Sequence, residues 1–328
     1  MTAPEAVAPL DPHALHGGLT SRAALASVAV ALLLLSLKGY AAWSTGSVAM
    51  LGSLADTGLD LVASLITLFG VRFAAQPADR LHRFGHGKAE ALVALFQVTL
   101  IIVAAFGIAL RAVERLGGGE ATVNAEYGIG VSLIAIAATL GLLAYQRHVI
   151  RQTHSVAIGT DHLHYQSDLF LNLSVIAALA MDQYLGLTGA DALFGIGIAL
   201  WLAWSAFRAS NTAVDQLMDK EWPLERRQRF IQVAGRHPLV VGIHDLRTRT
   251  SGMHDFAQFH IWVSPSMTIR EAHRVMDEIE ARLRPEFPGV EILIHPDPEG
   301  HIDGRGDPLQ AKDAAILVQQ EQRAEQGK

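Results

Sequence analysis

Long apolar runs, separated by short polar segments, fill the first two thirds of the chain. Each run holds about 20 or more predominantly apolar residues, which is the length a helix needs to cross the hydrocarbon core of a bilayer. The pattern therefore predicts transmembrane helices, with boundaries good to a few residues. Six spans are marked in this way, at about residues 22–44, 48–73, 89–113, 126–146, 160–182 and 190–214.

A different pattern follows the sixth span. Residues 223–236 have the spacing of an amphipathic helix, residues 240–250 and 256–263 alternate as strands do, residues 269–283 form a second helix, and residues 290–294 form a third strand that His295-Pro296-Asp297-Pro298 ends. The order helix–strand–strand–helix–strand indicates a small two-layer α+β domain of ferredoxin-like type. The fold class expected is thus an all-α six-helix membrane domain followed by an α+β cytoplasmic domain.

Composition agrees with this division. Half of the 328 residues are hydrophobic and only 18% are charged, which is too apolar for a soluble protein of this size. Charged residues are sparse between about residue 24 and residue 210 and become frequent after Asp219. We expect a flexible N-terminal arm (1–20), a six-span transmembrane domain (21–219), a cytoplasmic domain (220–298) and a polar tail (299–328).

The absence of cysteine narrows the possible chemistry. With no cysteine in the chain, disulfides, thiolate zinc sites and cysteine nucleophiles are excluded, and a metal ion must be bound by His, Asp and Glu. The net charge is −6, and no basic face suited to nucleic acid is present. The first 20 residues lack the apolar core of a cleavable signal peptide.

Basic residues between the spans predict the orientation in the membrane. The connections near 72–88 and 147–159 are rich in Arg and Lys, whereas the other three hold only Arg115. The positive-inside bias places those two connections in the cytoplasm, so with six spans both termini are cytoplasmic. Lys38, near the outer end of the first span, is interpreted as a lysine that snorkels to the interface.

Two carboxylates lie inside the second apolar run. Asp56 and Asp60 are four residues apart, so they share one face of a helix and their oxygens can converge on one point. Counting about 1.5 Å per residue from Ser47 places them near the middle of the bilayer. An ionised Asp in hydrocarbon costs roughly a few kcal/mol or more, and two like charges side by side cost more still. Such a pair requires a cation or shared protons.

The fifth span carries a second pair with the same spacing. His164 and Asp168 share a helical face, and Asp161 lies one turn toward the cytoplasm on that face, where it would suit an access funnel. His162 points about 160° away from His164 and is not expected to be a co-ligand. One helix that offers Asp56 and Asp60 and another that offers His164 and Asp168 would form a four-ligand site for a divalent metal.

The connection after the second span holds a possible second site. Asp79, His82 and His86 lie in one short loop that contains glycine. Three ligands in such a loop make a weaker cage than four ligands from two helices. Spacing alone does not separate a metal site here from a merely solvated loop.

Histidines are also concentrated in the cytoplasmic domain. His244 and His260 fall on neighbouring predicted strands, His273 on the second helix, and His295 and Asp297 at the end of the last strand. Each histidine by itself is also typical of an ordinary surface or core residue. Together, in a small domain without cysteine, they form a candidate metal cluster.

From Ser21 to Pro298 the chain resembles the cation diffusion facilitator family, in particular its bacterial zinc and ferrous-iron efflux branch. The motifs that carry the resemblance are specific in combination. They are Ser53-Leu54-Ala55-Asp56-Thr57-Gly58-Leu59-Asp60, Gln76-Pro77-Ala78-Asp79, Phe84-Gly85-His86-Gly87-Lys88-Ala89-Glu90, His164-Tyr165-Gln166-Ser167-Asp168, His244-Asp245-Leu246-Arg247-Thr248-Arg249 and Ile294-His295-Pro296-Asp297-Pro298.

The resemblance implies roles for the candidate residues. The family's transport site corresponds to Asp56, Asp60, His164 and Asp168, its loop site to Asp79, His82 and His86, and its cytoplasmic binuclear site, usually found at a homodimer interface, to His244, His260, His273, His295 and Asp297. Lys88 and Asp219 match a family salt bridge that joins the membrane parts of the dimer. Two residues depart from the pattern: Arg80 stands where relatives of this branch can carry an acid, and Pro296 stands where an amide can occur.

The expected function is therefore export of a divalent transition metal from the cytoplasm in exchange for protons that flow inward. Zn²⁺, with Cd²⁺ or Fe²⁺, is expected both as the transported substrate and as a bound regulatory ion, in a homodimer of the bacterial inner membrane. A membrane-anchored metal sensor is the alternative, in which Asp56 and Asp60 would be dispensable. An intramembrane metallohydrolase is disfavoured, because the chain has no His-Glu-x-x-His motif.

Overall fold

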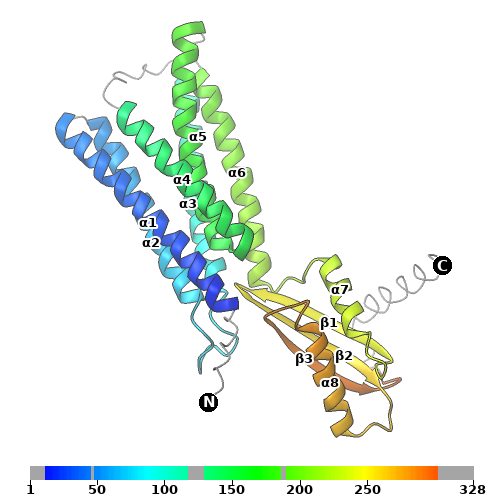
Figure 1. Cartoon of the computed structure of the whole chain (residues 1–328). Coiled ribbons are helices and arrows are strands. Elements are labelled where there is room, and N and C mark those ends of the chain that lie inside the picture. Colours follow the sequence, from blue (N-terminus) through cyan, green and yellow to red (C-terminus); the bar gives the residue numbers. More distant parts are fainter. Residues whose placement is uncertain (1–11, 46–47, 117–128, 186–189, 302–328) are drawn as a thin grey trace, which may run out of the picture. The chain divides into compact units, whose positions relative to one another are not determined.

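The chain folds into two compact units, which divide between Leu217 and Met218 (Figure 1). In this computed structural model residues 12–45, 48–116, 129–185 and 190–301 are described. Most of the predicted arm (1–11) and nearly all of the predicted tail (302–328) lie outside the described residues. Residues 12–20 belong to the first helix rather than to a flexible arm; there the hydroxyl of Thr20 is buried and donates to the carbonyls of His16 and Gly17.

The membrane unit consists, in its described part, of six long helices (Figure 1). Their bounds are α1 Pro12–Thr45, α2 Val48–Ala74, α3 Ala89–Leu116, α4 Ile129–Thr153, α5 Val156–Leu185 and α6 Ala190–Leu217. The helix α5 packs against all five others, and α3 packs closely along α6 as α1 does along α2. The predicted fifth span is therefore the helix around which the others are assembled.

Four of the six helices, within the described residues, are long and apolar enough by themselves to cross a membrane. These are the stretches Leu15–Ser44, Ser53–Ala74, Ala89–Glu114 and Ala192–Leu217. The other two long helices carry more polar residues. The last two turns of α4 contain Arg147, His148 and Arg151, and α5 carries Asp161, His164 and Asp168. That α4 and α5 also span the membrane stays a prediction.

The end of the membrane unit that holds residues 75–88, which join α2 to α3, is here called the loop end. Residues 154–155, which join α4 to α5, lie at the same end, because α2 and α4 end there and α3 and α5 begin there. An apolar cluster from five helices fills the loop end: Ala23, Ala24, Val28, Leu68, Val71, Val93, Val149, Ala157 and Ile158. Glu90 on α3 caps the start of α5, since its carboxylate accepts hydrogen bonds from the backbone N–H of Val156 and Ala157. It also accepts a 2.6 Å hydrogen bond from the hydroxyl of Ser155, the residue before α5.

The second unit is a small α+β domain. It contains α7 (Leu224–Ala234), β1 (Gly242–Ser251), β2 (His254–Val263), α8 (Ile269–Leu283) and β3 (Val290–Pro298), the order that the sequence pattern predicts. In the sheet, β2 lies between β1 and β3, antiparallel to the first and parallel to the second. Alternate residues of β2, such as Phe259 and Ile261, pack against α7 and α8 in one core with Phe230 and Ile279.

The third strand is longer than expected. The pattern ends it at Ile294, but β3 continues through Pro298, so His295 and Asp297 are strand residues. Proline is tolerated here because β3 is an edge strand in the described part of the chain, paired with β2 on one side and with no described strand on the other. The extension brings His295 into register with His260.

A close approach of α2 and α3 near the loop end yields a prediction. A Cβ at Gly70 would clash with Cγ2 of Val93, and a valine side chain has little rotamer freedom in a helix. We expect Gly70→Ala to lower stability by about 1–3 kcal/mol, as overpacking does, measured as a lower Tm in detergent.

Two variants control for this measurement. Gly107→Ala, on α3, has open space around the added methyl group and should leave the Tm unchanged or slightly raised, since alanine favours helix. The double variant Gly70→Ala/Val93→Ala should recover part of the loss relative to Val93→Ala alone. An unchanged Tm for Gly70→Ala would show that the two helices separate easily.

Candidate metal-binding sites

Three groups of side chains converge within the described residues so that their ligand atoms lie within 4.8 Å of one another. They are Asp60, His164 and Asp168 in the membrane unit, Asp79, His82 and His86 in the connection after α2, and His244, His260 and Asp297 in the α+β domain. Each group corresponds to a candidate site from the sequence. The loop group contains all three predicted residues, whereas the membrane group and the group of the α+β domain each lack at least one predicted member.

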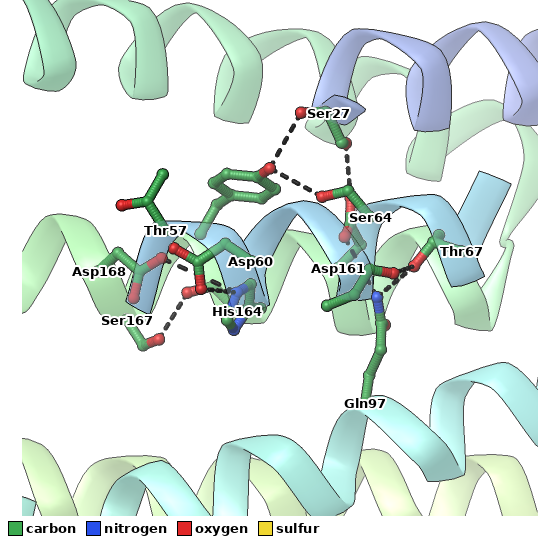
Figure 2. A network of polar contacts seen from close by, with 12 residues as sticks. Ser27, Thr57, Asp60, Ser64, Thr67, Gln97, Asp161, His164, Ser167 and Asp168 are labelled. Atoms are coloured by element: carbon green, nitrogen blue, oxygen red, sulfur yellow. Dashed lines mark hydrogen bonds and ion pairs between the residues drawn. The ribbon is translucent and has the colours of Figure 1, made fainter. Parts of the chain in front are cut away.

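The membrane group is formed where α2 crosses α5 (Figure 2). His164 Nε2 lies 3.1 Å from Asp60 Oδ1 and 3.9 Å from Asp168 Oδ2. The shorter separation is that of a hydrogen bond. Both separations would also let the atoms bind one shared ion, because zinc–nitrogen and zinc–oxygen bonds are about 2.0–2.2 Å long. All three side chains are partly shielded from solvent, and His164 is the most shielded.

Hydrogen bonds to neighbouring helices hold α5 in this position. The hydroxyl of Tyr165 donates to the carbonyl of Ser27 on α1 over 3.0 Å and lies 2.8 Å from Ser64 Oγ on α2. Tyr165 and Ser64 are both buried. The residue after His164 is thus fixed to both helices of the α1–α2 pair, which sets the distance between His164 and Asp60.

Asp56, the predicted fourth ligand, is not among the converging atoms. It lies one turn from Asp60 on α2 and is exposed. The structure brings together three of the four residues, and a ligand role for Asp56 stays a prediction. Lys38, which was expected to snorkel, instead donates a 2.7 Å hydrogen bond to Thr57 Oγ1, so a positive charge lies beside this acidic segment.

Asp161 lines no open access funnel in this structure, contrary to the expectation. Its side chain is 0% exposed and accepts hydrogen bonds from Ser27, Gln97 and Gln146 (Figure 2). The helical spacing placed it correctly on the face of His164, but the polar partners on three other helices cover it. Sequence reasoning missed these partners, because a single Ser or Gln in an apolar helix has no distinctive pattern.

The loop group is held by the local backbone. Asp79 Oδ1 accepts hydrogen bonds from the backbone N–H of Leu81 (2.8 Å) and of His82 (2.6 Å). The His82 N–H, as the largest cause, lowers the pKa of Asp79 below its ordinary value, so the carboxylate is ionised throughout the neutral pH range. His86 Nε2 lies 3.4 Å from Asp79 Oδ2 and 3.1 Å from His82 Nδ1. The buried His86 ring packs edge-on against Phe73.

Strand register organises the cluster of the α+β domain. His244 pairs with His260 across β1 and β2, and His260 pairs with His295 across β2 and β3, so three imidazoles form one row across the sheet. Neighbouring ring centroids are 5.1 Å and 4.8 Å apart. Phe259 and Ile261, the residues on either side of His260 in β2, belong to the core that the helices cover. Because successive strand residues point to opposite faces, the row of imidazoles lies on the face opposite the helices.

Asp297 connects the members of this row. Its Oδ2 lies 2.8 Å from His260 Nδ1 and 3.4 Å from His244 Nε2, and its Oδ1 lies 3.4 Å from His295 Nε2. The carboxylate is buried, whereas the side chain of His295 is 62% exposed. Its two oxygens therefore face different imidazoles, which is an arrangement suited to a carboxylate shared by two ions.

The structure does not bring His273 to this row within one chain. His273 lies on α8, is 71% exposed and faces Asp277 at 3.8 Å, while α8 covers the other face of the sheet through Val275 and Ile279. The helical spacing that buries those residues directs His273 to solvent. Its predicted role therefore requires a second chain and stays a prediction.

Asp245 is a neighbour that the sequence analysis did not select. A register shift between His244 and Arg247 interrupts the β1–β2 ladder, and Asp245 has a positive φ of 50°. The bulge redirects the carboxylate, so that Asp245 Oδ2 lies 3.8 Å from His260 Nε2. Its other oxygen accepts a 3.0 Å hydrogen bond from Arg247, and Asp245, His260 and His295 line one open cavity.

Lys88 and Asp219, the residues of the predicted dimer salt bridge, belong to different compact units. Each has contacts within its own unit. Lys88 donates to the carbonyl of Leu217 over 3.2 Å. Asp219, with a positive φ of 54°, lies 3.5 Å from a guanidinium nitrogen of Arg249. A bond between Lys88 and Asp219 stays a prediction.

Comparison with known proteins adds independent information. Residues 24–218 match the family model of the cation efflux transmembrane domain, and residues 222–299 match that of the cation efflux protein cytoplasmic domain. The cation-efflux pump FieF of Yersinia pestis (strain Pestoides F) is 45% identical over 289 residues, which cover 88% of this chain and 95% of the pump. FieF of Yersinia pseudotuberculosis (serotype O:3, strain YPIII) gives the same values.

Solved structures match about a quarter of this chain, at low TM-scores. The zinc form of CzrB is 35% identical, covers 26% of this chain and 99% of its own chain, and has a TM-score of 0.23. A structure of MamM-CTD 215–293 is 25% identical, covers 24% of this chain and 100% of its own, and has a TM-score of 0.22.

The loop group yields a prediction about bound metal. His82→Ala removes one of three converging ligands, and because the His82 side chain is about half exposed (53%) the change leaves no core cavity. We expect equilibrium dialysis of the purified full chain to show a loss of about one zinc ion per protomer, as a three-ligand site loses its chelation.

The control for this measurement is His148→Ala. His148 is also exposed, and its ring contacts Gln152 at 3.1 Å on α4, so this variant should bind as much zinc as the parent chain. Equal zinc content in His82→Ala and His148→Ala would mean that the loop is only solvated.

Proposed function

The chain belongs to the cation efflux family, the cation diffusion facilitators, and from that premise we propose that it exports divalent transition-metal ions from the cytoplasm in exchange for protons. It is a multi-pass membrane protein. The observation that carries the proposal is the convergence of Asp60, His164 and Asp168 between α2 and α5. Ligand atoms that meet inside an apolar bundle need an ion, since unpaired charges there are costly.

The donor set indicates the cargo. Carboxylate oxygens with one imidazole suit tetrahedral Zn²⁺ and also admit Cd²⁺ or Fe²⁺, whereas a set made only of oxygens favours Mg²⁺ or Mn²⁺. Asp56, one turn away on α2, is proposed to complete a four-ligand site when the ion is bound. The 45% identical relatives are named as cation-efflux pumps, which agrees with an ion as substrate.

Proton exchange follows from the same atoms. A metal ion binds the deprotonated forms of Asp and His, so binding displaces protons and protonation releases metal. When the site faces the outside, protons that enter the empty site keep its charges neutral on the return step. Metal and protons therefore compete for one set of lone pairs, and an inward proton gradient drives outward metal flow.

Orientation is proposed from charge. The loop end carries Arg72, Arg80, Arg83 and Lys88 together with Arg147 and Arg151, and the positive-inside bias assigns it to the cytoplasm. In this orientation the loop group faces the cytoplasm, from which it would receive metal. The membrane is proposed to be the bacterial inner membrane.

The cytoplasmic domain is proposed to bind regulatory metal in a homodimer. The cluster around Asp297 lies on the sheet face that the helices leave open, and the matched family model bears the name ZT_dimer. His273, which faces solvent in one chain, would supply a ligand to the cluster of a second copy. Lys88 and Asp219 would join the membrane parts of the same dimer.

Metal flux tests the transport site. We expect His164→Ala and Asp60→Ala, reconstituted in proteoliposomes under a pH gradient, to lower the initial rate of zinc transport on the order of 100-fold or more, since even outer-shell partners of metal ligands typically cost about 10- to 100-fold in affinity or activity. Repeating the assay with Cd²⁺, Fe²⁺ and Mn²⁺ ranks the cargo.

The matched control is Glu114→Gln, an exposed carboxylate in the last turns of α3, which should transport at the parent rate. Normal zinc flux in folded His164→Ala would exclude the site. Regulated zinc binding with no flux in the parent protein would instead favour a membrane-anchored sensor.

Mixed dimers test the role of His273. If His273 acts in trans, a dimer of one His260→Ala chain and one His273→Ala chain retains one intact cluster. In that cluster the His273→Ala chain supplies the unaltered sheet residues and the His260→Ala chain supplies the unaltered His273. Each pure variant dimer retains none. We expect zinc binding at the cytoplasmic cluster to reappear in the mixed dimer, measured by calorimetry on tagged and separated heterodimers. No recovery would contradict a ligand from the second copy.

A further inference from the structure

Asp161 is a fully buried carboxylate that the proposed transport site does not use. It lies on α5, one turn before His164, and belongs to none of the three converging ligand groups among the described residues. Ionisable residues inside a membrane bundle are rare and costly unless they serve a purpose. Its contacts indicate what that purpose is.

Side chains on three other helices donate hydrogen bonds to the carboxylate of Asp161 (Figure 2). Ser27 Oγ on α1 donates to Oδ2 over 2.6 Å, Gln146 Nε2 on α4 donates to Oδ2 over 2.8 Å, and Gln97 Nε2 on α3 donates to Oδ1 over 3.1 Å. The second hydrogens of the two amides are also used: Gln146 donates to Ser27 Oγ over 3.0 Å, and Gln97 donates to Thr67 on α2. This polar cluster therefore ties α5 to four other helices.

The polar cluster lies between the transport site and the loop end. Helix α5 begins at Val156 at the loop end, and Asp161 lies five residues along it. At about 1.5 Å of axial rise per residue, His164 and Asp168 lie farther from the loop end than Asp161. Thr67 is likewise nearer than Asp60 to the loop end of α2. Beyond the cluster, toward the loop end, come the apolar side chains of Leu68, Val71 and Ile158.

Burial changes sharply across this region. Asp60 and Asp168 retain 24% and 36% of their side-chain surface, while Asp161, Gln97 and Gln146 are buried almost completely. The structure thus buries the side chains on the loop-end side of the site, while the carboxylates of the site itself stay partly exposed. This buried region has a polar layer and an apolar layer, and the polar layer depends on one carboxylate.

A carboxylate is suited to a closure that must open. Its bonds here come from neutral donors, so water that enters between the helices can replace each donor and solvate the charge. Without either the donors or water the buried charge is unpaired, which is strongly unfavourable. Intermediate arrangements are therefore disfavoured, and the cluster has two favourable states. In one state water is excluded and all the hydrogen bonds are formed; in the other the helices are apart and water solvates the carboxylate.

We propose that Asp161 is the lock of the transport cycle, the residue that holds α5 against α1, α3 and α4 and so closes the path between the transport site and the loop end. Opening this path separates Asp161 from Ser27, Gln97 and Gln146 and admits water. The lock acts on α5, which carries His164, so it also positions the imidazole 3.1 Å from Asp60. This inference rests on the proposed transport function for its purpose but not for its test.

The chain's lack of cysteine makes the lock measurable through one introduced thiol. Ala157→Cys places a reporter on α5 within the apolar layer, at a position that is 0% exposed and one turn nearer the loop end than Asp161. In the purified full-length protein in detergent, its rate of reaction with a water-soluble maleimide reports how often the path opens. Ala199→Cys on α6, also buried, reports general loosening of the bundle.

Asp161→Asn keeps the size of the side chain but points an amide N–H₂ at donors. We expect it to raise the labelling rate of Ala157→Cys on the order of 10-fold or more, as expected when a hydrogen-bonded buried charge loses its partners, and to leave Ala199→Cys unchanged. Gln146→Leu, which removes one donor at similar volume, should raise the rate in the same direction and by less. Glu114→Gln is the matched control and should change neither reporter.

Equal labelling of Ala157→Cys in the parent, Asp161→Asn and Gln146→Leu proteins would overturn the lock. A parallel rise at Ala199→Cys would also overturn it, because it would mean that Asp161 only maintains the fold. If Asp161→Asn does not fold, Gln146→Leu alone decides between these outcomes. A lock that opens as expected in a protein without metal flux would leave this inference standing and remove the proposed transport function.

Discussion

The structure of the membrane unit depends on the cost of a bare carboxylate in a nonpolar bundle. Asp60, Asp161 and Asp168 each need a partner there, and the chain provides two kinds. Asp60 and Asp168 meet the imidazole of His164 at 3.1 Å and 3.9 Å, a set of atoms that an ion or protons can occupy and leave. Asp161 meets only neutral donors, which are covalently part of the helices and leave only when the helices move. One electrostatic requirement thus produces a group of converging ligand atoms and, one helical turn away, a hydrogen-bonded junction of helices.

The two units build their ligand clusters by different geometries. In the membrane unit the spacing along one helix aligns His164 with Asp168, and the crossing of α2 and α5 adds Asp60. In the α+β domain strand register aligns His244, His260 and His295 in one row, and Asp297 on the edge strand joins them. The helices of that domain cover one face of the sheet, so the row faces outward, where a second copy can reach it. The first arrangement gathers its ligand atoms from two helices of one chain, whereas the second leaves its row of imidazoles uncovered by the domain's own helices.

The loop end combines both kinds of constraint. Gly70 allows α2 to approach Val93 on α3, the carboxylate of Glu90 caps the start of α5, and the apolar cluster fills the space between five helices. Tight packing of this kind changes between discrete states rather than gradually. The match of residues 24–218 to the cation efflux transmembrane domain gives this closure a purpose, because a pump must open its site to one side at a time.

Local geometry is what the sequence alone determined about this protein. Residues four apart on a helix share a face whatever surrounds them, so the pairing of His164 with Asp168 and the order of helices and strands were predicted from spacing. For the Asp79–His86 loop group spacing alone left a solvated loop equally open, and the family resemblance favoured a metal site. Tertiary structure decided which separate elements meet. Ser27, Gln97 and Gln146 are common polar residues spread over 120 positions, and only the packing of four helices brings them to Asp161. The β-bulge that turns Asp245 toward His260 and the pairing that extends β3 through Asp297 likewise depend on a neighbouring strand. Long-range contacts leave no periodicity in the chain, and for that reason they became visible only in the folded protein.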